Sequence, residues 1–195
     1  FIYGVMDIQE QKREIRRKIR SLKGEQTTAD NESASSVIAH KLLQLEGISS
    51  SRTILLYHSL PDEVSTHYLI KYLHSAEGGS KRIILPVVEG EYLTLKEYNP
   101  IEMEYGYRNI MEPQGGKDVD PSEIELAVIP GVAFDSNCNR MGRGKGFYDK
   151  LLPFLKCPKI GLGYGFQIVE SIPCCQHDIP LDMVITESAT YCRPL

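Results

Sequence analysis

Residues 140–149, Arg-Met-Gly-Arg-Gly-Lys-Gly-Phe-Tyr-Asp, form the stretch of the chain best suited to binding a charged ligand. Glycine stands at every second position from 142 to 146, and glycine can adopt positive φ angles and bring the backbone close to a ligand. The cationic side chains between the glycines, together with backbone N–H groups at the start of a predicted helix, would bind phosphate oxygens. The spacing matches neither the P-loop nor the dinucleotide-binding fingerprint. We therefore predict a polyphosphate-binding loop of another kind, with a solvated basic turn as the alternative.

Two carboxylates are candidates for a metal ion. Asp149 falls in the first turn of the helix that the loop would lead into, and His177-Asp178 is the second candidate. Mg²⁺ on a nucleotide is typically held by one or two carboxylates together with phosphate oxygens. Judged by spacing alone, a structural role is the better interpretation of each, because the helix dipole already stabilises a carboxylate in the first turn.

A cationic helix is predicted over residues 8–22. Its isoleucines and leucine recur on one stripe, and basic residues occupy the other faces. A charge run of this kind is most often a solvated surface. Lys12 and Arg16, however, lie one helical turn apart on the same side, which suits two contacts to phosphate groups.

The rest of the chain alternates between helices and short apolar strands. A second helix is expected from an Asp30 or Ser33 N-cap to a stop at Gly47, a third after Ser65 or Thr66, and a fourth over residues 147–155. Buried strands are expected at residues 53–57, 83–85 (ended by Pro86), 126–129, 160–162 and 183–185, a half-exposed strand at 91–98, and a long connection at 99–121.

This alternation predicts an α/β fold: a single-domain layered sheet, largely parallel, with helices on both faces. Residues 126–129 are the best candidate for the central strand because all four are apolar. Ligands of such sheets bind beyond the carboxyl ends of the strands. The loops after Tyr57, Ile129 and Leu162 are therefore expected to surround the site.

Composition and charge exclude some classes of binding partner. The chain has 195 residues and a net charge of −4, which argues against a nucleic-acid partner, since binding to phosphate backbones favours basic proteins. No apolar run is long enough to span a membrane. Five cysteines without a C-x-x-C pair indicate neither a disulfide framework nor a zinc site, so we expect a reducing, cytoplasmic location. Residues 1–6 are interpreted as a possible upstream remnant or disordered start, and 7–195 as one domain.

The loop also carries a family resemblance. Pro130-Gly-Val-Ala-Phe-Asp135, followed by residues 139–152, closely resembles the signature of the 5-formyltetrahydrofolate cyclo-ligases, also called 5,10-methenyltetrahydrofolate synthetases. Supporting similarities extend over most of the chain: Lys12-x-x-x-Arg16, Leu60-Pro-Asp-Glu-Val64, Leu85-Pro86, Glu112-Pro113, Gly163-Tyr-Gly-Phe-Gln167 and His177-Asp178. The family fold is similar to those of sugar-phosphate isomerases and CoA transferases.

The resemblance implies a C–N bond-forming ligase that closes 5-formyltetrahydrofolate to 5,10-methenyltetrahydrofolate and consumes Mg-ATP. The formyl oxygen is a very poor leaving group, and its phosphorylation would allow it to leave as phosphate. N10 would then attack the formyl carbon. Such chemistry depends on positioning and charge stabilisation, so it needs no side-chain nucleophile. The implied partners are the folate and ATP, with no obligate protein partner.

The resemblance also implies roles for individual residues. The implied catalytic residues are Arg143 and Lys145, and the implied magnesium ligands are Asp149 and Asp178. The residues implied to bind ATP are Lys12, Arg16, Arg140, Met141, Gly142, Arg143, Gly144, Lys145, Gly146, Phe147 and Tyr148. The residues implied to bind the folate are Leu60, Glu63, Ser65, Arg143, Gly144, Lys145, Gly146 and Phe147.

Two positions depart from the family pattern. Phe147 stands where family members often carry a tyrosine, and Ser65 where an acidic residue is common. Two other functions stay open at this point. One is a sugar-phosphate isomerase or acyl-CoA transferase with Glu63 as the base, and the other is a nucleic-acid-binding module built on the basic helix and the loop.

Overall fold

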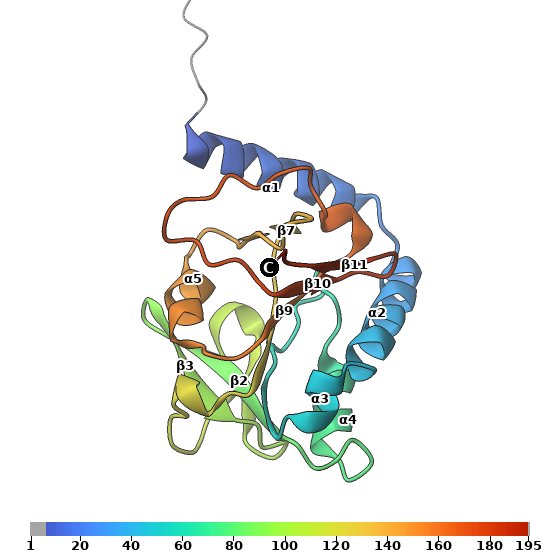
Figure 1. Ribbon diagram of the computed structural model, residues 1–195. Coiled ribbons are helices and arrows are strands. Elements are labelled where there is room, and N and C mark those ends of the chain that lie inside the picture. The colour runs from blue at the N-terminus through green and yellow to red at the C-terminus, as the bar shows by residue number, and fades with distance from the viewer. Residues whose placement is uncertain (1–6, 195) are drawn as a thin grey trace, which may run out of the picture.

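The computed structural model describes residues 7–194, so the interpretation of residues 1–6 falls outside the described chain. Its centre is a seven-stranded sheet in the order β11-β10-β9-β6-β1-β2-β3 (Figure 1). The strands are β1 (Thr53–Leu55), β2 (Arg82–Glu89), β3 (Tyr92–Glu97), β6 (Leu126–Ile129), β9 (Lys159–Leu162), β10 (Met183–Ile185) and β11 (Thr190–Cys192).

The sheet is largely parallel. The five strands from β10 to β2 run parallel, and the two edge strands β11 and β3 are antiparallel to their neighbours. All four residues of β6, the middle strand, are buried, as its continuous apolar run predicted. The predicted α/β class and the central position of residues 126–129 are confirmed.

Helices cover both faces of the sheet. The helices are α1 (Ile8–Gly24), α2 (Thr28–Leu43), α3 (Glu46–Ser50), α4 (His67–His74) and α5 (Phe147–Leu151), and the 3₁₀ turns are η1 (Tyr107–Asn109), η2 (Pro121–Glu123), η3 (Leu152–Phe154) and η4 (Gly165–Gln167). Figure 1 shows α2, α3 and α4 on one side of the sheet, α5 on the other, and α1 across one end. Each side has its own apolar core, built around Leu42 and Leu69 on one face and around Phe134 and Leu152 on the other.

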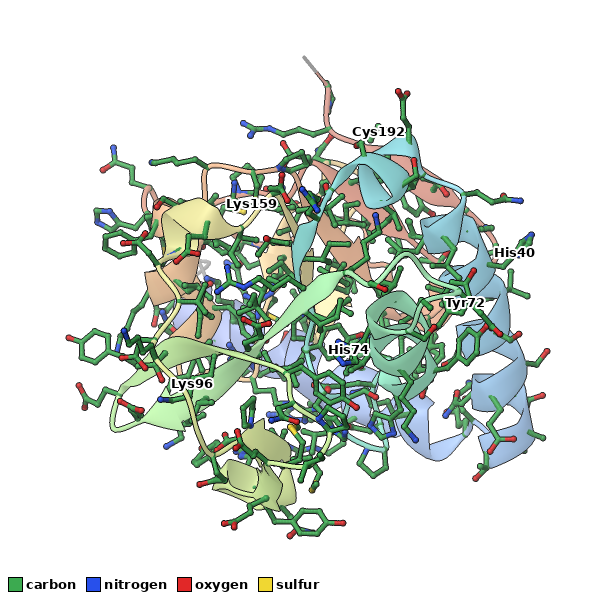
Figure 2. The ribbon with its side chains drawn as sticks, turned by 90° about the horizontal axis from the view of Figure 1, so that it is seen from below. His40, Tyr72, His74, Lys96, Lys159 and Cys192 are labelled. Carbon is green, nitrogen blue, oxygen red and sulfur yellow. The ribbon has the colours of Figure 1, made fainter. Side chains whose placement is uncertain are left out.

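Figure 2 shows the molecule from below, with helices and sheet edge on either side. His40 of α2 and Lys96 of β3 lie on opposite sides of the molecule, with the sheet between them. No helix among residues 7–194 has the length and apolar character needed to cross a membrane.

Pro86 lies inside β2 and does not end it as expected. β1 pairs with β2 only as far as Ile84, whereas β3 pairs with β2 from Ile84 to Glu89. Two residues after the proline, the N–H of Val88 points away from β3 and donates to the Glu112 carboxylate. The nitrogen of Pro86 therefore faces the same side, where no strand requires a donor, and the proline is tolerated.

The expected long connection at residues 99–121 instead holds a small hairpin. Its strands are β4 (Met103–Tyr105) and β5 (Met111–Pro113), joined through η1. A second short pair, β7 (Ala133–Phe134) and β8 (Arg140–Met141), flanks the glycine-rich loop. Strands of two or three residues carry too little periodicity to be recognised from the sequence.

The helix limits also differ from expectation. Thr27 caps α2, because its Oγ1 accepts a hydrogen bond from the N–H of Asp30 at 3.1 Å. Gly47 does not stop that helix but lies within α3. The helix predicted over 147–155 ends as an α-helix at Leu151, since Pro153 lacks the N–H that the next turn would need.

Candidate active site

A cavity of about 900 Å³, counted with its open mouth, lies at the carboxyl ends of β1, β2 and β6. The residues that line it are Tyr57, His58, Leu60, Glu63, Pro86, Val88, Leu93, Tyr107, Arg108, Ile110, Glu112, Pro130, Gly131, Val132, Arg140, Gly142, Arg143, Lys145, Gly146, Phe147, Tyr148 and Asp149.

The loops expected after Tyr57 and Ile129 do surround the cavity, as predicted. The loop after Leu162 supports it from outside the lining. Tyr164, on that loop, donates from its hydroxyl to the carbonyl oxygen of Glu63 at 3.0 Å. The carboxyl edge of the sheet therefore holds the site, as doubly wound sheets generally do.

The glycine-rich loop forms one wall. It leaves β8 at Met141 and enters α5 at Phe147. Gly144 and Gly146 have φ angles of 104° and 73°, which strain any residue with a side chain. The loop therefore needs glycine at these two positions to turn back along the cavity.

Arg140 organises the base of this loop. Its side chain is only 6% exposed; Nε donates to the carbonyl oxygen of Pro130 at 2.6 Å, and one terminal nitrogen donates to Asp149 at 3.3 Å. The guanidinium also lies 5.1 Å from the centre of the Tyr148 ring. Burial lowers the pKa of Arg140 while Asp149 raises it, so the carboxylate compensates part of the cost of burying the charge.

Arg143 connects the loop to the segment after β1. The same terminal nitrogen donates to Asp62 at 2.7 Å and to Glu63 at 3.1 Å. Glu63 also accepts from the N–H of Leu60 at 2.9 Å. Burial would raise the pKa of Asp62, but hydrogen bonds from Arg143 and Lys23 outweigh it and lower the pKa to about 2.

Helix α1 approaches the loop from outside the cavity lining. The Nζ of Lys12 is 3.0 Å from the carboxylate of Asp178, which also accepts from the N–H of Cys175. Arg16 donates from Nε to the carbonyl oxygen of Gly142 at 3.0 Å. Arg16 therefore contacts the loop, and Lys12 contacts the segment that holds Asp178. Lys23, further along α1, is also paired, with Asp62 at 2.8 Å.

The β4–β5 hairpin forms another wall of the cavity, beside the end of the glycine-rich loop, and sequence reasoning missed it. Tyr107, Arg108 and Ile110 line the cavity from the hairpin, and the Tyr107 ring meets Phe147 edge to face at 5.6 Å. Glu112 is 5% exposed, and burial raises its pKa. The only local signal was a tyrosine–arginine pair shortly before Glu112-Pro113.

Most predicted site residues come together here, but some do not reach the lining. Ser65 donates its backbone N–H to Ser35 of α2, and the Met141 side chain is buried in the small core under α1. Lys12, Arg16, Gly144 and Asp178 lie behind the lining, around the loop. The roles predicted for all these residues stay predictions.

The site fits a metal ion that takes few ligands from the protein and the rest from water and a bound phosphate. Residues 7–194 contain no group of three or more His, Cys, Asp or Glu residues arranged to hold a metal. The carboxylate of Asp149 is 48% exposed and lines the cavity beside Arg140. One accessible carboxylate suits Mg²⁺, which commonly keeps water and phosphate oxygens as its remaining ligands.

A parallel sheet with a cationic glycine-rich loop and a largely apolar cavity at its carboxyl edge defines a ligand-binding α/β protein. Residues 8–187 match the model of the 5-formyltetrahydrofolate cyclo-ligase family. The chain belongs to that family and is a ligase of folate metabolism.

Individual relatives are similar to this chain over most of its length. The 5-formyltetrahydrofolate cyclo-ligase of Escherichia coli K12 is 31% identical over 186 residues, covering 91% of this chain and 98% of that protein. The Haemophilus influenzae protein of the same name is 32% identical, and the match covers 88% of this chain and 95% of that protein. The solved 5,10-methenyltetrahydrofolate synthetase of Aquifex aeolicus superposes with a TM-score of 0.82 at 33% identity, covering 93% and 92%.

Proposed function

We propose that this protein closes 5-formyltetrahydrofolate to 5,10-methenyltetrahydrofolate and hydrolyses Mg-ATP to ADP and phosphate in doing so. The observation that carries the proposal is the bridge from Arg143 to Asp62 and Glu63, which joins the glycine-rich loop to the segment after β1 around one cavity. A reaction between two substrates requires such a shared cavity, since its main task is to bring them together. The names of the relatives support the same activity.

The chemistry requires two displacements. The formyl oxygen attacks the γ-phosphorus of ATP, and the bond from that phosphorus to the bridging oxygen breaks, so that ADP leaves. N10 then attacks the formyl carbon, the carbon–oxygen bond breaks, and phosphate departs with the bonding electrons. The loss of the N10 proton leaves the conjugated methenyl product.

The loop residues supply positioning and charge for both displacements. Lys145 lines the cavity and makes no ion pair within residues 7–194, so its charge is available to the transferred phosphoryl group. Arg143 faces the same space while it holds Glu63. We assign catalytic roles to Arg143 and Lys145 because fixed cations stabilise the charge that develops on phosphoryl oxygens.

The two substrates would occupy different parts of the cavity. ATP phosphates would lie along residues 140–148, with Lys12 and Arg16 supporting the loop from α1. The folate would lie against Leu60, Glu63 and the ring of Phe147. Phe147 keeps a stacking surface, and its lack of a hydroxyl removes one hydrogen bond that a tyrosine could make.

Asp149 would hold Mg²⁺ from the cavity, and Asp178 would hold it from the side of α1. When bound, Mg²⁺ neutralises phosphate charge and orients the leaving group. Asp178 first has to share its carboxylate with Lys12, whose Nζ lies 3.0 Å away.

The contacts of Glu63 favour this ligase over an isomerase or acyl-CoA transferase. One carboxylate oxygen of Glu63 accepts from Arg143 and the other from the N–H of Leu60. A carboxylate engaged on both oxygens is a poor base for removing a proton from carbon.

The proposal also includes one functional domain over residues 7–195 and a reducing, cytoplasmic location. The five free cysteines support that location.

The test is an absorbance assay. The purified protein, 5-formyltetrahydrofolate, ATP and Mg²⁺ should produce the near-ultraviolet band of the methenyl product, and removal of ATP or chelation of Mg²⁺ should abolish it. Asp149→Asn should raise the Mg²⁺ concentration for half-maximal rate about tenfold, since it removes an anionic ligand. Asp118→Asn removes a carboxylate that pairs with Lys96 away from the cavity, and should leave the titration unchanged.

Product formation without ATP would overturn the proposed phosphorylation. No product under any condition would overturn the proposed function. A normal Mg²⁺ titration for Asp149→Asn would show that this carboxylate serves only Arg140 and α5.

A further inference from the structure

Arg108 is a cation on the cavity wall for which the described residues provide no anion. Arg140 pairs with Asp149, and Arg143 pairs with Asp62 and Glu63. Arg108 also lines the cavity, is exposed, and makes no ion pair within residues 7–194. Its guanidinium lies 5.7 Å from the centre of the neighbouring Tyr107 ring. An aromatic ring holds such a group in place without neutralising it.

The backbone presents this side chain in an uncommon conformation. Arg108 has φ 53° and ψ 30°, in the left-handed region that few residues with side chains adopt. The turn is closed on both sides, by a hydrogen bond from the N–H of Gly106 to the oxygen of Ile110 and by one from Asn109 back to Gly106. Such positions persist where the surroundings determine them and are concentrated at ligand sites.

Glu112 fastens the hairpin to the sheet. Its buried carboxylate accepts from the N–H of Val88 on β2 at 3.2 Å, and also from the backbone of Tyr107. Tyr107 is further held by its ring contact with Phe147. The wall that carries Arg108 is thus anchored at both ends, and its guanidinium is presented by a fixed frame.

Arg108 lies away from the part of the loop that α1 supports. Arg16 of α1 contacts the loop at Gly142, whereas the hairpin contacts β2. Figure 1 shows α1 and the pair β2 and β3 on opposite sides of α5. A ligand that reaches from the phosphate-binding loop along the cavity would have its far end near the hairpin.

Resting on the proposed function, we propose that Arg108 binds the carboxylates of the glutamyl end of the folate substrate and makes the enzyme select for it. The formyl group must meet the γ-phosphate at the loop, so the pterin lies there, and the aminobenzoyl-glutamate extends away from it. The two carboxylates of the glutamate are the anions that an unpaired guanidinium at that end would recognise. Guanidinium–carboxylate pairs are strong because two parallel hydrogen bonds can form.

The test is a cycle of two proteins and two substrates. Wild type and Arg108→Asn are each measured with 5-formyltetrahydrofolate and with 5-formyltetrahydropteroate, which lacks the glutamate. Asparagine is chosen because it accepts positive φ angles. Wild type should show a KM about tenfold higher for the pteroate, and Arg108→Asn should reduce this ratio to below about twofold, with kcat unchanged for both substrates.

Two further variants sharpen the result. Arg108→Lys keeps the charge but not the paired donors, so it should restore part of the ratio. Arg52→Asn removes the same residue type just before β1, at the opposite edge of the sheet, and should keep the wild-type ratio. An unchanged ratio in Arg108→Asn, or a higher KM for ATP in place of the folate, would overturn the inference.

Equilibrium binding separates this inference from the proposed reaction. If wild type forms no methenyl product, the proposed function fails, and calorimetric titration with the same two ligands still tests Arg108. In that case the wild type should bind the glutamate-bearing ligand about tenfold more tightly, and Arg108→Asn should bind both nearly equally. Equal binding of both ligands by wild type would reject the inference.

Discussion

Arg143 has a double task among the residues of the site. It donates to Asp62 and Glu63 and at the same time lines the cavity. Burial opposes its charge, but those two carboxylates outweigh it and raise the pKa of Arg143. A cation balanced in this way is fixed in position before a ligand arrives, which is the condition for stabilising a developing negative charge.

Replacement of Arg143 should therefore impair catalysis more than stability. We expect Arg143→Ala to lower kcat/KM about 100-fold, because a positioned donor to the transition state is lost. The kcat/KM of Arg143→Lys should lie between those of wild type and Arg143→Ala, since lysine keeps the charge but cannot reproduce the planar guanidinium group. Steady-state kinetics with both substrates varied would measure this.

Arg82 provides the matched control. It also bonds two carboxylates, Glu97 and Glu123, but at the start of β2, on the edge opposite the cavity. Arg82→Ala should leave kcat/KM unchanged. Equal kinetic effects of Arg82→Ala and Arg143→Ala would show that loss of an ion-pair bridge, and not loss of a group in the site, causes the defect.

Among the elements, the β4–β5 hairpin has the most specific packing requirement. A Cβ on Gly106 would lie 2.0 Å from a carboxylate oxygen of Glu112, so Gly106→Ala must displace this buried group. The φ angle of Gly106 is −114°, outside the left-handed region, so the contact between the added Cβ and Glu112 is the conflict that this variant tests. Displacement would remove the hydrogen bond from Val88 that anchors the hairpin.

We expect Gly106→Ala to cost about 1–3 kcal/mol in the free energy of unfolding, the usual penalty for a buried group that loses its partner. The KM for the folate should rise at the same time, because Tyr107 and Arg108 shift with the hairpin. Urea unfolding and kinetics measure the two effects. Gly24→Ala, at the end of α1 with open space around it, is the control and should change neither.

A stable Gly106→Ala protein with wild-type KM would contradict the anchoring role of Glu112. Glu112→Gln discriminates further, because it keeps the side-chain length and an acceptor oxygen. Its KM for the folate should stay close to wild type if anchoring, and not charge, is what Glu112 contributes.

For the molecule as a whole, pH-dependent stability should reflect His58 in the cavity wall. The His58 ring lies 4.1 Å from the His67 ring. Burial, with the charges of His67 and Lys71, lowers the pKa of His58 from 6.5 to about 4. Between these two values the unfolded chain binds more protons at this residue than the folded chain, so stability rises with pH and is lost as pH falls from about 6.5 towards 4.

We expect His58 to contribute a loss of about 1–2 kcal/mol between pH 6.5 and 4.5, after allowance for solvent screening. His58→Asn should flatten this part of the curve of unfolding free energy against pH. The same substitution at His40, exposed on α2, should leave the curve as in wild type (Figure 2). The raised pKa of Glu112 also changes the slope of this curve, so the difference between wild type and His58→Asn in urea unfolding from pH 7.5 to 4.5 is what assigns the effect to the histidine. If His58→Asn left the curve of unfolding free energy against pH unchanged, the lowered pKa of His58 would be contradicted.

Local patterns in the sequence were enough to predict the central sheet and the glycine-rich loop. An apolar run such as Leu126–Ile129 is buried wherever it lies in a parallel sheet, and glycines at 144 and 146 permit a turn that other residues resist. The helical spacing of Lys12 and Arg16 likewise predicted that both lie on one face of the helix, and in the fold Lys12 contacts Asp178 and Arg16 contacts the loop. These features depend on neighbours within a few positions along the chain.

Contacts between distant segments were settled by packing. The bond from Arg143 to Asp62 spans 81 positions, and no local period predicts which carboxylate a cation meets. Ser65 belongs to a predicted site segment, yet its backbone bonds to Ser35 and it lies outside the cavity lining. The hairpin with Arg108 has strands too short for a recognisable period, so its place on the cavity wall follows from tertiary contacts such as the bond of Glu112 to β2. Burial and partner choice are properties of the assembled core, which is why sequence patterns predict the loop but not the hairpin wall of the same cavity.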